Sequence, residues 1–436
     1  MLRITPTKAA RRLALSLLIC LAPDGVTAQA EPDNQTELRK TDHGFVLLRN
    51  GEPYVVKGAG AVSRLEEFAA AGGNSIRTWG AGPELGPLLD EAHRHGLTVT
   101  VGLWLEHKSK GMDYDDPEMV ADQLEDFREQ VRMWKDHPAL LVWGVGNEVA
   151  LWFGENNPNI WKAHEQVAQM IAEEDPGRPT MIVIAELGER KIEYIREYCP
   201  SIDIIGINSY GGAASVGERY HAHGLDKPYM ITEFGAFNHY ELPRTAWDVA
   251  IEQTSTQRAR SCLLVQQVHS VNPHGKFLGS YWFYWGGQDK DIPGWHSAFL
   301  KSGATLGTFD AMTYLWSGAW PDNLAPQLEE LLTLAELDGM TPGSTFSVQA
   351  IVYDTDNDGL TATWELRPER PPPSTWGDHE PPIGDPIEGA IVESSPHRAT
   401  IRVPDKHGPY RLYYVVTDTN HKAATGSVAL RVGERE

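Results

Sequence analysis

Residues 140–149 read LLVWGVGNEV, and this stretch decides the fold. Its first six residues are apolar or glycine, which indicates a strand buried on both faces, and the strand ends by presenting Asn147 and Glu148. Residues 228–237, PYMITEFGAF, have the same design and deliver Glu233 after an apolar run. Two strands of this kind predict a parallel sheet that carries one carboxylate at the end of each strand.

Apolar segments of this kind recur on both sides of residues 140–149 and alternate with helical patterns. Strands that are apolar on both faces and alternate with helices belong to parallel sheets, and eight of them predict a closed (β/α)8 barrel, an α/β fold. A doubly wound open sheet is the alternative, but no glycine-rich fingerprint follows the first strand. The eight segments are residues 54–60, 74–80, 97–107, 140–149, 179–187, 202–212, 228–237 and 277–287.

Asp116 and Pro117 are an N-cap residue and a proline suited to the first helical position, so a helix is expected to begin there. Pro138 is expected to end it. A long helix is expected over residues 245–269, between the seventh and eighth strands.

The barrel pattern is flanked by β-type sequence at both ends. Asn50 and Gly51 favour a type I′ hairpin before the first barrel strand. After residue 342, several short alternating runs predict an immunoglobulin-like β-sandwich. We therefore expect a barrel with its N-terminal hairpin over residues 31–320, followed by a linker and the C-terminal β-sandwich over residues 321–436.

Residues 1–30 have the composition of a signal peptide. Lys8, Arg11 and Arg12 form a basic region, an apolar run follows, and residues 28–30 form an A-x-A cleavage site. A short uncleaved membrane anchor is the alternative, although the apolar run is shorter than the roughly 20 residues that span a bilayer. We expect a secreted or periplasmic protein with no membrane span after cleavage.

The chain of 436 residues carries a formal net charge of −22. Such acidity argues against nucleic acid and anionic membrane surfaces as partners and suits a neutral ligand. Cys199 and Cys262 lie outside the signal segment, and we expect two buried thiols rather than a disulfide.

The carboxyl ends of the strands are where a (β/α)8 barrel places its catalytic groups. Glu148 and Glu233 end the fourth and seventh strands, which face one another across the barrel mouth. Two carboxyl groups about 5–5.5 Å apart support retaining glycoside hydrolysis, in which one attacks the anomeric carbon and the other protonates the leaving oxygen. In strand order, the candidate residues are Arg77, Trp79, Glu106, His107, Asn147, Glu148, Glu186, Asn208, Tyr210, Glu233, Trp282 and Trp285.

Some of these residues have expected supporting roles. Arg77 is suited to keep one carboxylate ionised, and Tyr210 is suited to donate a hydrogen bond to the same group. Trp285 is the favoured aromatic platform, because the apolar faces of sugars pack on aromatic rings. For Glu106, His107 and Glu186, a peripheral subsite and simple solvation remain equal alternatives.

The strand ends resemble those of the large clan of (β/α)8 retaining glycoside hydrolases that carry glutamates on strands 4 and 7; the motifs are WGVGNEV, ITEFG, IRTWG, INSY and YWFYW. The chain looks most like the family 2 glycoside hydrolase catalytic barrel, and next like the family 72 β-1,3-glucanosyltransferases. The resemblance implies that Glu148 is the acid/base and Glu233 the nucleophile. It also implies that Asn147 contacts the sugar 2-hydroxyl, that Arg77 and Tyr210 orient Glu233, and that Trp285 floors the −1 subsite.

The expected function is a metal-independent retaining β-glycosidase that needs no cofactor and acts on a neutral oligo- or polysaccharide. Hydrolysis and transglycosylation share the glycosyl-enzyme intermediate, so a β-glucan transglycosylase is an open alternative. A non-catalytic carbohydrate-binding protein is the second alternative. A typical family 2 enzyme has β-sandwich domains before its barrel, whereas this chain has only a hairpin there, so the resemblance does not assign the sugar.

Residues 354–359 together with Glu365 match the calcium-loop pattern D-x-D-x-D-G-x5-E. The helices that flank such a loop are not expected, because strand patterns lie on both sides. A polar β-turn is the favoured interpretation of Asp354, Asp356 and Asp358. Calcium held by a turn between strands is the alternative.

Overall fold

The structure is a computed structural model of the chain, and it describes residues 34–61, 63–151, 155–238, 240–286, 296–370 and 383–433. The expected signal segment, residues 1–30, lies outside the described residues. In the part of the chain that is described, no helix combines the length and the apolar character needed to cross a bilayer.

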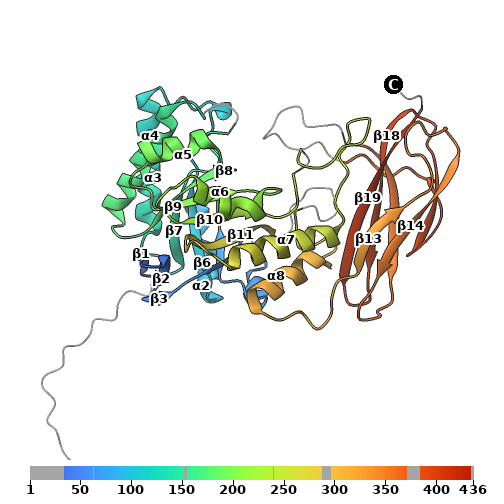
Figure 1. Ribbon diagram of the computed structural model, residues 1–436, viewed down its shortest axis with the longest axis horizontal. Helices are drawn as coiled ribbons and strands as arrows, with labels where there is room; N and C mark the ends of the chain where they lie inside the picture. Colours follow the sequence, from blue (N-terminus) through green and yellow to red (C-terminus); the bar gives the residue numbers. More distant parts are fainter. Residues whose placement is uncertain are drawn as a thin grey trace, which may run out of the picture.

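The centre of the molecule is a closed eight-stranded barrel, which confirms the predicted (β/α)8 architecture (Figure 1). Neighbouring strands pair in parallel, and every residue of β6, β7, β9 and β10 is buried, as expected for a sheet covered on both faces. The strands are β4 (Val56–Ala61), β5 (Ser75–Arg77), β6 (Thr98–Leu103), β7 (Leu140–Val145), β8 (Thr180–Ala185), β9 (Ile204–Asn208), β10 (Tyr229–Phe234) and β11 (Phe277–Trp285).

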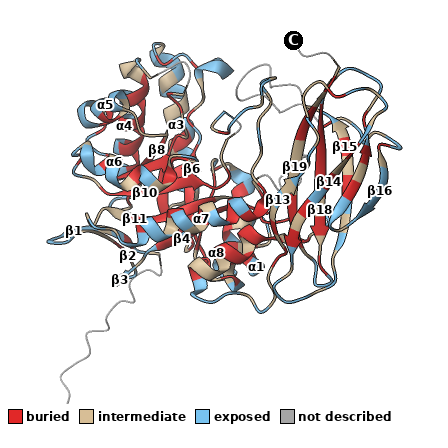
Figure 2. Cartoon of the chain, turned by 45° about the vertical axis from the view of Figure 1, so that its right-hand side comes forward, coloured by how far each residue is buried: buried red, intermediate tan, exposed pale blue. Residues whose placement is uncertain are grey.

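Helices surround the barrel, and their buried faces cover the strands (Figure 2). The expected helix start is confirmed, since Asp116 accepts hydrogen bonds from the first-turn amides of α3 and Pro117 is its first residue. The α-helices are α1 (Leu65–Ala70), α2 (Gly86–Arg94), α3 (Pro117–Trp134), α4 (Pro158–Glu174), α5 (Glu189–Tyr198), α6 (Val216–Ala222), α7 (Ser255–Ser270) and α8 (Gly307–Ser317). Short 3-10 helices among the described residues accompany them: η1 (Pro83–Leu85), η2 (Lys108–Lys110) and η3 (Ala213–Ser215).

The long helix expected over residues 245–269 is wrong in its first ten residues. Helix α7 begins only at Ser255, because Thr254 and Gln257 form a capping box that fixes the helix start. The residues before Thr254 form an irregular segment between β10 and α7.

The N-terminal hairpin closes the end of the barrel where the strands begin. It consists of β1 (Thr36–Thr41), β2 (Gly44–Arg49) and β3 (Glu52–Pro53). Asn50 and Gly51 both have positive φ, at 50° and 82°, as the expected type I′ turn requires. Leu47 packs into a cluster with the early residues of the barrel strands, such as Val56 and Leu141. The hairpin therefore lies at the end of the barrel opposite to the strand ends that carry Glu148 and Glu233.

The C-terminal region contains two four-stranded sheets that share one core. One sheet has the order β12–β19–β18–β15, and the other has the order β13–β14–β17–β16. The strands are β12 (Thr305–Leu306), β13 (Gln327–Leu332), β14 (Thr345–Tyr353), β15 (Thr361–Pro368), β16 (Ile391–Ser395), β17 (Arg398–Arg402), β18 (Gly408–Thr417) and β19 (Lys422–Val432). The immunoglobulin-like relationship of this sandwich stays a prediction, as do the exact domain boundaries. Helix α7 contacts β13 and β19, so the barrel and the sandwich are joined (Figure 1).

Candidate active site

Glu148 lies three residues beyond the end of β7 in a constrained backbone conformation. Its φ is +54°, and Gly146 just before it has a φ of +70°. A positive φ is costly for a residue with a β-carbon, so neighbouring contacts must hold it in place. The Glu148 amide donates to the carbonyl oxygen of Val183 at 3.0 Å, and the Glu148 carbonyl accepts from Leu151 at 2.8 Å. The chain thus turns sharply and directs the carboxylate over the barrel end.

Glu233 is on β10, and its carboxylate is held by three donors. Arg77 donates to Oε1 at 2.9 Å, and the indole of Trp79 donates to the same oxygen at 3.0 Å. The hydroxyl of Tyr210 donates to Oε2 at 2.8 Å. The side chains of Arg77 and Glu233 are 3% and 9% exposed, so their ion pair is shielded from water. This environment compensates the negative charge of an ionised Glu233.

A chain of hydrogen bonds links the two glutamates. Asn208 donates to Oε1 of Glu148 at 2.7 Å and to Oδ1 of Asn147 at 3.2 Å. Arg77 donates from its second terminal nitrogen to Oδ1 of Asn147 at 2.6 Å, while its first nitrogen binds Glu233. Among the described residues, no protein group accepts a hydrogen bond from Nδ2 of Asn147.

The two carboxyl groups differ in their electrostatic environment. Burial and, next, the nearby charge of Glu233 raise the pKa of Glu148, while the hydrogen bond from Asn208 and the charges of Arg77 and Lys191 lower it, and the net result is a pKa of about 7. Glu148 therefore keeps its proton up to a pH of about 7 and loses it above that pH. Burial and the charge of Glu233 also raise the pKa of Tyr210 well above its ordinary value, so Tyr210 stays protonated and remains a donor.

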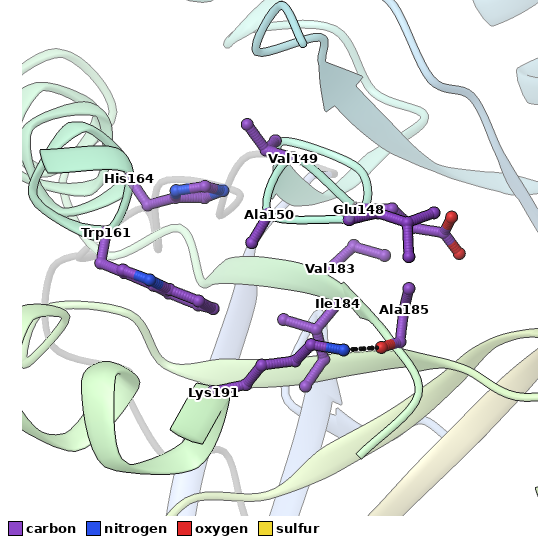
Figure 3. Close-up of a pocket in the computed structure, with 10 residues that line it drawn as sticks. Glu148, Val149, Ala150, Trp161, His164, Val183, Ile184, Ala185 and Lys191 are labelled. Atoms are coloured by element: carbon purple, nitrogen blue, oxygen red, sulfur yellow. Dashed lines mark hydrogen bonds between the residues drawn. The ribbon is translucent and has the colours of Figure 1, made fainter. Parts of the chain in front are cut away.

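A recess lies behind Glu148, between β8 and α4 (Figure 3). Trp161 and His164 line one side of it, and Lys191 lines another, with its ammonium donating to the carbonyl oxygen of Ala185. The carboxylate of Glu148 points away from Trp161 and His164 in this view. Burial lowers the pKa of His164 to about 4, so its imidazole is neutral. The recess therefore lies behind the carboxylate of Glu148.

The structure places five of the six predicted site residues together and corrects the sixth. Trp285 is fully buried, and its ring packs against Phe68, Phe299 and Trp316 on the outer side of the barrel. Its indole nitrogen donates to the carbonyl oxygen of Arg64. Because the ring is enclosed by other aromatic groups, Trp285 does not floor a sugar pocket. The five residues that meet at the site are Arg77, Asn147, Glu148, Tyr210 and Glu233.

Two residues without a predicted role also belong to this cluster. Trp79 donates to Glu233, and Asn208 donates to Glu148. Both lie at strand ends, and this position in the sequence could have marked them as site residues. Their hydrogen-bond partners could not be predicted, because these depend on the directions of the side chains. Trp79 is partly exposed at the site, whereas Trp285 is not. Trp79 is thus better placed than Trp285 to contact a bound sugar.

The weaker candidates lie around the rim. His107 hydrogen-bonds the carbonyl oxygen of Asn147 at 3.0 Å, and Trp104, 40% exposed, stacks on its ring. Glu186 has a positive φ like Glu148, but it forms an ion pair with Arg219 at 2.8 Å. Glu106 accepts from the amide of His107. These contacts fix the rim, and a subsite role for them stays a prediction.

The calcium-like motif folds as a turn between β14 and β15. Oδ1 of Asp354 accepts from the amides of Asp356 and Asp358, as in a polar turn. Glu365 points elsewhere and pairs with Arg367, so the twelve-residue calcium loop is not formed. Asp418 from the β18–β19 turn, which the motif did not include, lies near Asp354 and Asp358.

Part of the barrel matches a known protein family. Residues 87–243 match the model described as glycosyl hydrolases family 2, TIM barrel domain. This part of the barrel is similar to the barrels of family 2 glycoside hydrolases. The match covers β6 to β10 and includes both glutamates. The resemblance to the family 2 barrel expected from the strand ends is confirmed for this part of the chain. No curated protein sequence matches the chain.

Solved structures with a similar fold include several glycosidases. A calcium binding mutant of β-glucuronidase 2 from Bacteroides uniformis has a TM-score of 0.50 at 15% identity, over 91% of this chain and 47% of that one. A family 2 β-galacturonidase from Eisenbergiella tayi has a TM-score of 0.49 at 17% identity, over 65% of this chain and 54% of that one. The chain thus spans about half the length of these proteins. At such identities the likeness concerns the fold alone.

Proposed function

We propose that the chain is a secreted or periplasmic retaining β-glycoside hydrolase that acts on a neutral saccharide. The observation that carries this proposal is the contrast between the two glutamates. Glu233 is surrounded by three donors that stabilise its negative charge, whereas burial and the charge of Glu233 raise the pKa of Glu148 to about 7. A nucleophile and an acid need this difference.

The reaction then has two steps. In the first, a carboxylate oxygen of Glu233 bonds to the anomeric carbon, and the bond to the leaving oxygen breaks as Glu148 transfers its proton to that oxygen. In the second, Glu148, now ionised, takes a proton from water, and the water oxygen displaces Glu233 from the anomeric carbon. The free amide nitrogen of Asn147 is available to bind a sugar hydroxyl throughout. Atoms and charge balance, and both glutamates return to their starting states.

A labelling experiment tests the nucleophile. Activated aryl 2-deoxy-2-fluoro-β-glycosides of several neutral sugars are incubated with the protein, and the mass of the intact chain is measured. We expect the addition of one glycosyl group, and peptide mapping should place it on Glu233. The Glu233→Gln variant is the control and should gain no mass. Label on another residue would contradict the assignment, as would an initial product with inverted anomeric configuration.

The same panel separates the two alternatives. A transglycosylase would form longer products when an acceptor sugar is added, because the sugar hydroxyl replaces water in the second step. A carbohydrate-binding protein without activity would bind sugars yet release no aryl group from any substrate. For an enzyme, Glu148→Ala should leave the rate of the first step nearly unchanged for substrates with good leaving groups. It should lower that rate for substrates with poor leaving groups, since only these need protonation by the acid.

A further inference from the structure

The irregular segment before α7 lies between the site and the sandwich. It begins directly after β10, which carries Glu233, and it reaches Thr254 at the start of α7. In its described residues, 235–238 and 240–254, it has no helix or strand, and one isolated bridge joins Arg244 to Ala250. A long segment without regular structure depends on contacts with its surroundings to adopt one position. Those contacts come from two sides.

The first side is the C-terminal sandwich, through an apolar cluster and a buried ion pair. Ala236 and Leu242 of the segment pack with Ile383 and Tyr413 of the sandwich, and all four are buried. Arg411 of β18 donates to the carbonyl oxygen of Ala250 at 2.8 Å.

The ion pair continues this contact. Arg411 lies 3.6 Å from Glu252, with side chains 2% and 8% exposed, and it also binds Glu369 at 2.9 Å. Ion pairs as buried as these are screened little by solvent, and losing one partner leaves the other charge buried. The sandwich therefore fixes both the apolar side chains and the backbone of the segment.

The second side is the active site. Glu241 of the segment accepts from the amide of Gly211 at 3.0 Å and from the amide of Asn238 at 2.8 Å. Gly211 directly follows Tyr210, whose hydroxyl donates to Oε2 of Glu233. A β-carbon on Gly211 would lie only 3.0 Å from Glu241, so the two chains approach closely here. The segment is therefore tied to the turn that carries one of the three donors to Glu233.

We propose that the C-terminal sandwich is a positioning element of the active site: through residues 235–254 it fixes the turn of Tyr210 and hence the hydrogen bond to Glu233. Tyr413, Arg411 and Glu241 are the positioning residues, and none of them contacts the reacting atoms. The catalytic part of this inference rests on the proposed function. The sandwich follows the barrel in the chain, and it would fix the position of a segment that contacts the active site.

Other contacts between the two domains bypass the segment and provide the control. Arg260 of α7 pairs with Glu329 of β13 at 2.5 Å, with side chains 53% and 32% exposed. This pair joins the same two domains but touches neither the segment nor the turn of Tyr210. Arg260→Gln should therefore leave the site unchanged, whereas Tyr413→Ala removes the apolar contact that holds the segment.

Backbone-amide exchange of the full chain tests the structural part without any substrate. Mass spectrometry would follow the peptides that cover residues 209–213 and 240–254. In Tyr413→Ala we expect about tenfold faster exchange in both peptides. In the parent protein, local opening of the segment requires the contact with Tyr413 to break, and this cost is absent in the variant. Arg260→Gln should match the parent protein in both. Unchanged exchange of residues 209–213 in Tyr413→Ala would overturn the inference.

Kinetics on an aryl glycoside test the catalytic part. We expect Tyr413→Ala to lower kcat by about three- to tenfold with little change in KM, since the lost interaction acts on the bond to Glu233. The same substitution in a Tyr210→Phe background should have no further effect, because the hydrogen bond it acts through is already absent. If the decreases in kcat caused by the two substitutions multiply in the double variant, Tyr413 acts independently of the Tyr210 hydrogen bond. This result would show a merely structural role and refute the proposal.

A second variant keeps the test decisive if Tyr413→Ala does not fold. Glu241→Ala removes the acceptor at the site end of the segment and should give the same exchange and kcat changes. Glu241→Gln retains an oxygen for the amide of Gly211 and should restore both. If the parent protein cleaves no glycoside, the proposed function fails, while the exchange measurements still decide whether the sandwich positions the turn of Tyr210.

Discussion

Glu148 and Glu233 are identical side chains in different surroundings. Glu233 receives hydrogen bonds from Arg77, Trp79 and Tyr210, whereas among the described residues the side chain that donates to Glu148 is the neutral Asn208. In the proposed mechanism, the environment and not the residue type therefore separates the nucleophile Glu233 from the acid Glu148.

This asymmetry predicts the pH dependence of activity. Because the pKa of Glu148 is raised to about 7, kcat/KM should fall as the pH rises above about 7 and the acid loses its proton. In Glu233→Gln the pKa of Glu148 should fall, since the negative charge that raises it is gone. Carbon-13 NMR titration of labelled glutamate carboxyl groups would measure both proteins. An unchanged Glu148 titration in the variant would contradict the coupling.

The same shift predicts an effect on stability. The raised pKa of Glu148 means that its contribution to folding is present below its ordinary pKa and is lost as the pH rises through about 7. Glu148→Gln, which stays neutral, should have the same free energy of unfolding as the parent protein at pH 4. At pH 8 it should be more stable by about 1–3 kcal/mol. Urea unfolding at the two pH values measures this. The same difference in free energy of unfolding between variant and parent protein at pH 4 and pH 8 would contradict the prediction.

At the scale of the element, glycines on the barrel strands make room for the donors. A β-carbon on Gly60 of β4 would lie 2.6 Å from Cη2 of Trp79 and 3.3 Å from Tyr284. Strand β4 is adjacent to β5, which ends just before Trp79. The position of the indole therefore depends on a missing side chain of the neighbouring strand.

Gly60→Ala should displace Trp79 and weaken its hydrogen bond to Glu233. We expect kcat on an aryl glycoside to fall by about tenfold or more, because hydrogen bonds to charged groups contribute about 1.5–3 kcal/mol. Gly80→Ala, in the loop after Trp79, is the matched control, since its added β-carbon has no atom within 4 Å. Equal activities of the two variants would show that the indole does not depend on Gly60.

At the scale of the whole molecule, buried charges join barrel and sandwich. Arg411 contacts Glu252 and Ala250 from the barrel side and Glu369 from its own domain, and it is almost fully buried. Lys422 of β19 pairs with Asp310 of α8, and both side chains are also largely buried. The two domains should therefore unfold together.

Arg411→Met should lower the free energy of unfolding by about 3–5 kcal/mol, because two carboxylates are left buried without their partner. Arg260→Met, which breaks an exposed pair between the same domains, should cost only about 0–1 kcal/mol. Urea unfolding followed by tryptophan fluorescence measures both. Similar losses in the two variants would mean that burial does not set the strength of these pairs.

The sequence alone determined the barrel and the strand ends, because apolar periodicity and turn residues are local signals. The eight strands, the helix start at Asp116 and the hairpin turn at Asn50 were all predictable in this way. The strand-end position of Glu148 and Glu233 followed from the same patterns.

Only the tertiary structure decided which side chains face the site. Trp285 and Trp79 both stand near strand ends, yet Trp285 packs outward against aromatic residues while Trp79 turns inward to Glu233. Residues 245–254 show a helical pattern, yet the capping box at Thr254 and contacts with the distant Arg411 keep them irregular. Side-chain direction and contacts between residues far apart in the chain depend on packing, and packing has no local signal in the sequence.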